Sequence, residues 1–133
     1  MLFRSSTSEP GSGVDIYIGT GGAPEGVLAA AALRCIGGFM QGRLLFRNDD
    51  EKGRAAKLGV KDLNRKYGLL DLARGDVMFA ATGVTDGSMV RGVRRVGNSI
   101  LTSSMVMRSK TGTVRTIEAE HDLVRKPSAD PKA

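Results

Sequence analysis

The chain has 133 residues, which is enough for one domain with a modest core, and 41% of them are apolar. Its net charge of +6 suits anionic partners in general, but the basic residues are scattered and only four Phe and two Tyr could stack on bases, so we expect no nucleic-acid binding. No run of about 18 apolar residues could span a membrane, and a single cysteine excludes an intramolecular disulfide, so a soluble, reducing compartment is expected, most simply the cytoplasm.

The N-terminal third is expected to form a flexible segment, a strand and a helix. Residues 1–13 are too polar for a secretory signal and are rich in Ser, Thr, Gly and Pro, which favours a flexible segment. Residues 14–18 alternate apolar and polar side chains and predict a strand. Pro24 suits the first position of a helix over 24–36, which two glycines end. Cys35 on this helix is interpreted as a buried structural thiol.

The middle of the chain predicts two strands, a helix and a connector. Residues 40–46 are interpreted as the second strand. Asn48 opens a capping-box pattern, so a short polar helix is expected over 49–58. Residues 66–70 form a weak strand or a connector, and the apolar run 77–82 predicts a buried strand.

The last third predicts a hairpin. Residues 100–109 and 114–121 have strand character and flank a turn that contains glycine, so they are expected to pair antiparallel. Residues 123–133 are charged and rich in proline, which predicts a disordered tail. We therefore expect one α/β domain over 14–122, with a layered mixed sheet covered by helices and ending in an antiparallel hairpin.

The glycine-rich stretch between the first strand and the first helix does not match either nucleotide-binding motif. Starting from Gly19, the dinucleotide pattern requires a glycine at position 24, where the chain has Pro24. A phosphate-binding loop requires Gly-Lys-Ser/Thr, where the chain has Pro-Glu-Gly. A strand that leads through glycines into a helix N-terminus still provides N–H groups that favour an anion.

Glu25 lies in the first turn of that helix, and two interpretations are open. A carboxylate there complements the helix dipole by a few tenths to about 1 kcal/mol, and the residues alone favour this structural role. A carboxylate beside a phosphate would repel it unless a cation lay between them. The alternative is that Glu25 ligates a hard divalent metal ion that bridges to a phosphate.

Three blocks of the sequence resemble the class II fructose-1,6-bisphosphatases, which are bacterial sugar bisphosphate phosphatases. The blocks occur in the order of that family and together cover nearly the whole chain, and Gly-Gly-Ala-Pro-Glu-Gly is the most specific part. They are DIYIGTGGAPEGVLAAAALRCIGGFMQGRLL (15–45), GDVMFAATGVTDGSMVRGV (75–93) and MRSKTGTVRTIEAEH (107–121).

The resemblance implies a fold, a reaction and two site residues. The fold is that of the lithium-sensitive sugar phosphatases, and the reaction is hydrolysis of the 1-phosphate of fructose 1,6-bisphosphate to fructose 6-phosphate with Mg²⁺ or Mn²⁺. Some members also act on sedoheptulose 1,7-bisphosphate. In the family the glutamate of the glycine-rich block binds metal and a glycine three residues earlier contacts substrate, which makes Glu25 the metal ligand and Gly22 the substrate-binding residue.

The resemblance covers only the C-terminal part of a family member. It places the other metal-binding carboxylates and the substrate-binding arginines in the N-terminal part, and one carboxylate holds Mg²⁺ weakly. We therefore expect a fragment or half of a split enzyme with little or no activity alone, which forms a homo-oligomer or associates with the missing N-terminal part. A non-catalytic remnant that serves as an anion-binding or assembly module is the alternative. Phe39 and Phe46 depart from the family pattern and, if exposed, would mark a sticky surface.

The remaining candidate residues also have two interpretations each. Asp86 follows the strand 77–82, where an active-site loop would lie, but an Asp-Gly turn is preferred. Arg91, Arg94 and Arg95 could face a phosphate, although a solvated strand edge is preferred.

The other acids and the histidine are expected to have structural roles. His121 is the only histidine, so it is interpreted as a surface residue at a strand end rather than a general base. The acidic cluster 49–51 could bind metal, but acids are favoured in the first turn of a helix and we prefer that role. Asp15 is expected to face solvent or pair with an arginine.

Overall fold

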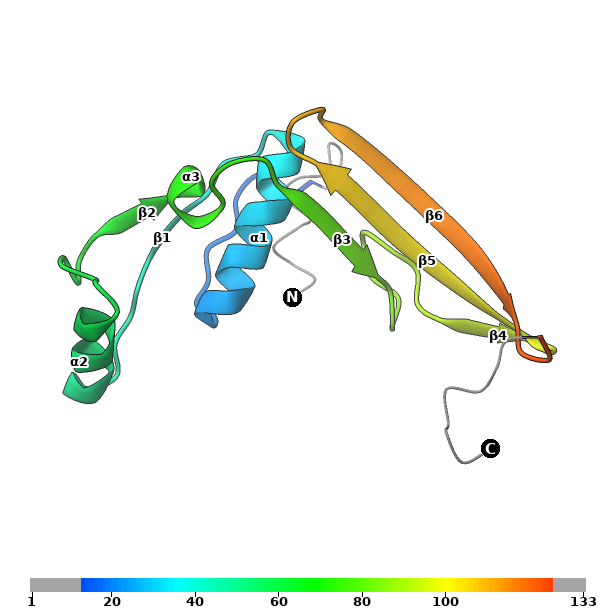
Figure 1. The fold of residues 1–133 in the computed structure, drawn as a ribbon, viewed down its shortest axis with the longest axis horizontal. Helices are drawn as coiled ribbons and strands as arrows, with labels where there is room; N and C mark the ends of the chain where they lie inside the picture. The colour runs from blue at the N-terminus through cyan, green and yellow to red at the C-terminus, as the bar shows by residue number, and fades with distance from the viewer. Residues whose placement is uncertain (1–12, 126–133) are drawn as a thin grey trace.

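The computed structural model describes residues 13–125, and the expectations for residues 1–12 and 126–133 lie outside the described residues. The described part forms three helices and six strands, and none of these helices is long and apolar enough to cross a membrane. Figure 1 labels the elements, which are α1 (Ala23–Ile36), β1 (Gln41–Arg43), α2 (Asp49–Lys57), β2 (Lys66–Gly68), α3 (Leu69–Leu72), β3 (Met78–Thr82), β4 (Arg94–Val96), β5 (Ser99–Arg108) and β6 (Thr113–Asp122).

The main sheet is built around β5. β6 pairs with one edge of β5 along its full length, while β3 and β4 pair with successive parts of the other edge (Figure 1). The second sheet is the two-stranded ribbon of β1 and β2. Every pairing among the described strands is antiparallel, so the expected mixed sheet is wrong. The expected C-terminal hairpin is confirmed as β5 and β6.

A second hairpin, β4 with β5, was not expected. Val96 pairs with Ser99, so only Gly97 and Asn98 connect the two strands. Gly97 has a φ of +57°, a left-handed conformation that glycine adopts without steric cost. A two-residue Gly-Asn connection between two β-branched or aromatic runs is a recognised hairpin signal. This hairpin was missed because Arg94 and Arg95 give β4 little apolar character.

Helix α1 packs its small side chains against one face of the main sheet. Ala32 and Cys35 form the core with Met107 of β5, and Phe79 and Met105 pack around them. The register places Phe79 opposite Met107, so these side chains share one sheet face. The Cys35 thiol donates to the Val77 carbonyl at 3.6 Å, and burial raises its pKa. The expectation of a buried structural thiol is confirmed.

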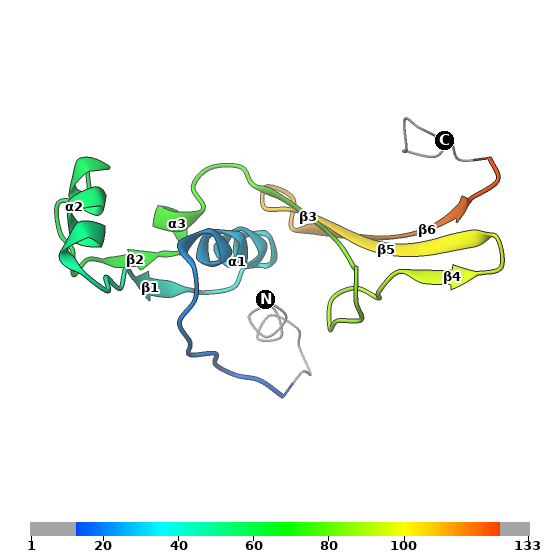
Figure 2. The ribbon, with the colours of Figure 1, turned by 90° about the horizontal axis from the view of Figure 1, so that it is seen from below.

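The ribbon of β1 and β2 and helix α2 lie on the other side of α1 from the main sheet (Figures 1 and 2). Asn48 caps α2 by accepting the Glu51 amide at 2.9 Å, and the Glu51 carboxylate accepts the Arg47 amide at 2.7 Å. Gly59, with a φ of +90°, follows the end of this helix. The predicted polar helix is therefore confirmed. The uncertain segment 66–70 contains β2 and the start of α3.

Residues 14–18 do not form the expected strand. Ile16 and Ile18 expose 73% and 86% of their surface, and the segment belongs to neither described sheet. The Tyr17 ring instead folds back over Gly19, where an added Cβ would approach the phenolic oxygen to 2.7 Å. A strand is defined by ladder hydrogen bonds to a neighbouring strand, and neither of the two described sheets includes this segment.

Large apolar side chains are unusually exposed in the described part of the chain. Within residues 13–125, Met107 and Cys35 are the largest fully buried side chains. A single domain over 14–122 therefore stays a prediction, because these residues bury little apolar surface by themselves. Eighteen large hydrophobic residues are exposed: Val14, Ile16, Tyr17, Ile18, Val27, Leu28, Phe39, Leu45, Leu58, Leu70, Met78, Val84, Val93, Val96, Val114, Ile117, Leu123 and Val124.

The buried methionine of β5 provides a test of the core. Met107→Ala should lower the free energy of unfolding by about 2–5 kcal/mol, because it leaves a cavity between α1 and the sheet. Met78→Ala is the matched control, since Met78 exposes 69% of its surface and should change stability by less than about 0.5 kcal/mol. Urea unfolding followed by circular dichroism measures both. Equal effects would contradict the assignment of the core.

An ion pair joins the segment before β3 to the end of β5. Arg108 donates to Asp76 at 2.7 Å, and this hydrogen bond lowers the pKa of Asp76. The Ser109 hydroxyl accepts the Val77 amide at 2.8 Å, while the Ser109 amide donates to the Val77 carbonyl at 2.9 Å. The two segments are therefore held together by charge and by backbone pairing.

The lowered pKa of Asp76 gives this ion pair a defined pH dependence. Its stabilisation should be complete above the ordinary carboxyl value of 3.8 and disappear as the pH falls through the lowered folded-state pKa. The melting temperature of the parent chain should therefore exceed that of Asp76→Asn at pH 6, and the difference should vanish in stronger acid. Arg108→Gln should show the same convergence. A difference that persists in acid strong enough to protonate Asp76 in the folded chain would show that the charge is not responsible.

Candidate functional site

Glu25 lies in the first turn of α1, as expected. The helix begins at Ala23, so Pro24 is its second residue rather than its first, and Glu25 is the third. Gly22 is the N-cap, and its carbonyl accepts the first helical hydrogen bond from the Gly26 amide at 3.1 Å. The N-cap has no side chain to bond the free amides, so the positive end of the helix dipole is open to a ligand or to the Glu25 carboxylate.

The two residues singled out for the site touch one another. A Cβ added to Gly22 would collide with Oε2 of Glu25, so the carboxylate lies directly against the Gly22 Cα. Gly22 has a φ of −65°, which any residue can adopt, so its backbone conformation does not require glycine. The Glu25 carboxylate occupies the space beside the Gly22 Cα, so this flexible side chain would have to move to admit a Cβ.

At the N-terminus of α1 the described residues place one carboxylate that could bind a metal ion, rather than a complete metal site. Mg²⁺ and Mn²⁺ prefer carboxylate oxygens, so the exposed Glu25 carboxylate fits as a ligand. Within residues 13–125 no group of three His, Cys, Asp or Glu side chains is placed to hold an ion. A metal at Glu25 would need further ligands from elsewhere.

Asp86 closes the loop between β3 and β4. Its Oδ1 accepts the Gly92 amide at 2.9 Å, and the Gly87 amide donates to the Val90 carbonyl at 3.1 Å. A Cβ on Gly92 would come within 2.8 Å of the Asp86 amide nitrogen, so the backbone at Gly92 packs directly against the backbone at Asp86. Asp86 therefore has a structural role in this loop, although residues 86 and 87 do not form the expected Asp-Gly turn.

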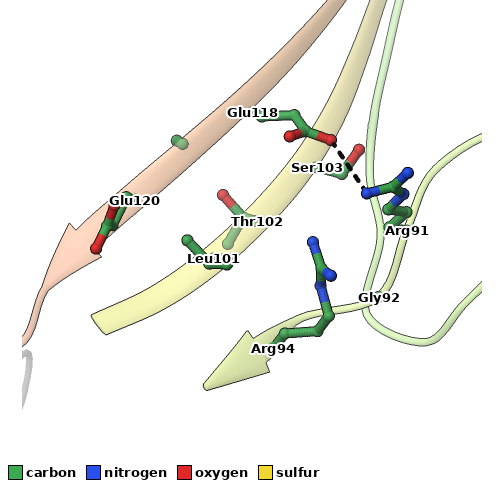
Figure 3. Close-up of a pocket in the computed structure, with 9 residues that line it drawn as sticks. Arg91, Gly92, Arg94, Leu101, Thr102, Ser103, Glu118 and Glu120 are labelled. Carbon is green, nitrogen blue, oxygen red and sulfur yellow. Dashed lines mark ion pairs between the residues drawn. The ribbon is translucent and has the colours of Figure 1, made fainter. Parts of the chain in front are cut away.

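Arg91 and Arg94 line a pocket of about 210 Å³ on the main sheet, shown in Figure 3. The register places Arg94 and Glu120 on either side of Leu101, while Glu118 lies opposite Ser103. An Arg91 nitrogen lies 3.9 Å from a Glu118 oxygen, and both side chains are about two-thirds exposed, so this ion pair contributes little stability.

The charges of this pocket do not favour a phosphate. Two guanidinium groups face two carboxylates, so the lining is close to neutral. The third candidate, Arg95, alternates with Arg94 onto the opposite face of the sheet, where its Nε donates to the Gly97 carbonyl at 3.3 Å. Strand β4, which carries Arg94, lies at the end of the main sheet away from α1 (Figures 1 and 2). The preferred interpretation of these arginines as part of a solvated strand edge therefore holds.

The remaining candidate site residues lie outside any functional cluster among the described residues. His121 lies at the end of β6, where its Nε2 is 3.1 Å from the Thr102 hydroxyl. The acids at 49–51 occupy the first turn of α2, and Asp49 pairs with Lys52 at 2.7 Å, which lowers the Asp49 pKa. Asp15 is exposed and has no ion-pair partner among the described residues.

The sequence interpretation did not single out Glu118 and Glu120 as pocket residues. Their spacing of two along a predicted strand places both on one sheet face, and this was the available signal. The position of Arg91 and Arg94 opposite them depends on the register of three strands, which residue spacing does not specify.

The Asp86 contact gives a testable difference between two substitutions. Asp86→Ala removes the acceptor of the Gly92 amide and should lower the free energy of unfolding by about 1–3 kcal/mol. Asp86→Asn keeps an oxygen acceptor of the same size and should cost much less. Thermal unfolding of both variants measures the difference. Equal losses would contradict the hydrogen bond as the role of Asp86.

Most of this chain is similar in sequence to proteins that are named fructose-1,6-bisphosphatases. The family described as bacterial fructose-1,6-bisphosphatase, glpX-encoded, matches residues 5–121. Fructose-1,6-bisphosphatase class 2 of Haemophilus influenzae is 43% identical over 128 residues, which cover 86% of this chain and 38% of that protein. Fructose-1,6-bisphosphatase 1 class 2 of Escherichia coli K12 is 40% identical over 134 residues, which cover 90% of this chain and 40% of that protein.

The match covers nearly all of this chain but less than half of the length of each of these relatives. The chain spans about two fifths of the length of the curated relatives that it matches. Because the family match covers well over half of the chain, the membership is clear: the chain belongs to the bacterial, glpX-encoded fructose-1,6-bisphosphatase family.

Proposed function

We propose that this chain supplies part of the active site of a class II fructose-1,6-bisphosphatase. The reaction is hydrolysis of the 1-phosphate of fructose 1,6-bisphosphate to fructose 6-phosphate and phosphate. The observation that carries the proposal is the Glu25 carboxylate held against Gly22 at the N-terminus of α1, inside the region that matches the family. An open helix N-terminus favours the negative charge of a phosphate.

Glu25 is proposed to be one ligand of an Mg²⁺ or Mn²⁺ ion. Such an ion, when bound, polarises the phosphoryl oxygen and neutralises negative charge that develops during hydrolysis. Gly22 leaves room for the carboxylate and lets a substrate approach the backbone. The helix places this carboxylate beside free N–H groups, so a phosphate and its counter-ion could both be held at one point of the fold.

The other ligands are proposed to come from the part of the family's length that this chain does not span. The absence of a three-ligand cluster in residues 13–125 is consistent with little or no activity of the chain alone. The exposed apolar side chains support association, either with such a part or with further copies of the chain. The same absence also supports a second candidate, a non-catalytic assembly module.

A chimera tests the role of Glu25. In this chimera the segment of the Escherichia coli K12 relative that aligns with the chain is replaced by the chain. Glu25→Gln should weaken Mn²⁺ binding about 10-fold or more and lower phosphate release from fructose 1,6-bisphosphate, because it removes a charged ligand. Isothermal titration with Mn²⁺ and a phosphate-release assay measure the two effects.

Two glycine substitutions provide matched controls within the same turn. Gly22→Ala should also weaken Mn²⁺ binding, because its Cβ takes the place of the Glu25 carboxylate. Gly26→Ala meets no atom within 4 Å and should leave binding unchanged. Unchanged Mn²⁺ binding in Glu25→Gln would refute the ligand role, and a chimera that binds Mn²⁺ without releasing phosphate would favour the non-catalytic module.

A further inference from the structure

The pocket on the main sheet contains a buried hydroxyl group that has no partner. Ser103 exposes only 6% of its surface and lines this pocket (Figure 3). Its hydroxyl makes no hydrogen bond to any of residues 13–125, and the oxygen is not fully sealed by protein atoms, so it opens into the pocket. Buried polar groups in proteins are nearly always hydrogen-bonded, and an exception requires an explanation. A bound ligand would supply the missing partner.

Two charged side chains of the same pocket also lack ion-pair partners among residues 13–125. Arg94 comes from β4 and Glu120 from β6, and the register places them on either side of Leu101 in β5 (Figure 3). Two strand spacings separate their backbones, which is about 10 Å. The pocket therefore offers a positive and a negative group on opposite sides of an apolar residue.

The other charged pair of the pocket is loose enough to admit a ligand. The Arg91 and Glu118 side chains point toward one another in Figure 3, but their closest charged atoms are 3.9 Å apart, which is longer than a hydrogen bond. Glu118 lies opposite Ser103 in the register, so this pair borders the unpartnered hydroxyl. A ligand group that bonds to Arg91 or to Ser103 would displace only a weak contact.

The backbone around the pocket is already fixed. The Gly83 amide donates to the Ser103 carbonyl at 3.0 Å, and a Cβ on Gly83 would collide with the Arg91 carbonyl. The loop that carries Arg91 is thus packed against the end of β3, and Asp86 closes it through the Gly92 amide. A ligand would have to order side chains here but not the backbone, which lowers the entropic cost of binding.

We infer that this pocket binds a small zwitterionic molecule. Its anionic group would lie near Arg91 and Arg94, its ammonium group would lie near Glu118 and Glu120, and the Ser103 hydroxyl would bond to it. A ligand with one charge meets as many like charges as opposite charges in this lining, whereas a zwitterion pairs with both. A volume of about 210 Å³ is below that of a pocket for a drug-sized ligand, which indicates a small metabolite.

This inference goes beyond the proposed function and does not depend on it. The lining residues come from β4, β5, β6 and the loop before β4, whereas Glu25 and Gly22 lie at the N-terminus of α1. Mn²⁺ binding by the chimera and zwitterion binding by the pocket are separate measurements, so either can fail while the other succeeds.

Three compounds with the same carbon chain test the charge requirement. Isothermal titration of the chain should show one saturable site for 5-aminovalerate, whose carboxylate and ammonium groups are separated by methylene groups. Valerate carries only the anionic group and pentylamine only the cationic group, so each should bind at least about 10-fold more weakly, because one charge-assisted contact is lost. Equal affinities for the three compounds, or no binding of 5-aminovalerate at millimolar concentration, would overturn the proposal.

Three substitutions assign the contacts. Arg94→Gln should make 5-aminovalerate bind no better than pentylamine, and Glu120→Gln should make it bind no better than valerate. Ser103→Ala should weaken 5-aminovalerate binding by about 5-fold, because it removes a hydrogen bond to a charged group. If Ser103→Ala does not fold, the two charge variants decide the question, since both of these side chains are exposed.

Arg95→Gln is the matched control on the same strand. Arg95 lies on the opposite face of the sheet, so its substitution should leave 5-aminovalerate binding unchanged. Weakening by Arg95→Gln as large as that by Arg94→Gln would overturn the proposal, because it would show a general effect of net charge. The same titration of the chimera separates a ligand pocket from a protein contact. Binding by the chain but not by the folded chimera would overturn the proposal in favour of a surface that contacts the rest of an enzyme.

Discussion

The contact between α1 and the main sheet determines where the candidate site lies. Ala32 and Cys35 bring the helix close to Met107, because small side chains let a helix approach a sheet closely. With its C-terminal half fixed in this way, the helix presents its N-terminus, Gly22 and Glu25 away from the sheet. The proposed chemistry depends on that placement, since it is the helix N-terminus that holds the carboxylate beside free amides.

The described residues make several local polar contacts while leaving much apolar surface exposed. Asn48 caps α2, Asp86 closes the loop before β4, and Arg108 pairs with Asp76 between β3 and β5. These contacts specify the local geometry of each element. They do not bury Ile16 or Ile18, and hydrophobic burial is the main favourable term in folding. The chain spans about two fifths of the length of these relatives, and its described residues bury little apolar surface by themselves.

The sequence predicted the features that depend on neighbouring residues. Helix α1 ends at a left-handed Gly37, and α2 begins at Asn48, both as their capping residues indicate. The hairpin of β5 and β6 follows from two strand patterns around a glycine turn. The predictions of a mixed sheet and of a strand over 14–18 failed because strand pairing depends on neighbours that are distant in sequence.

The candidate site likewise has features that local sequence predicts and features that only the structure shows. Pro24 and the glycines before it indicate a helix start, so the position of Glu25 in the first turn could be predicted from local sequence. Its interpretation as a metal ligand came from the resemblance to a family, because a first-turn acid alone favours a dipole role. The contact of its carboxylate with Gly22 required the structure, as did the charge-balanced pocket around Arg91 and Arg94.

The most direct test of the central claim is a crystal structure of the chimera with Mn²⁺, in which anomalous scattering locates the ion. The account predicts a peak in direct bonding contact with a Glu25 carboxylate oxygen, at the N-terminus of α1 and beside residues from outside the matched region. A peak elsewhere, with the Glu25 side chain directed into solvent, would contradict it.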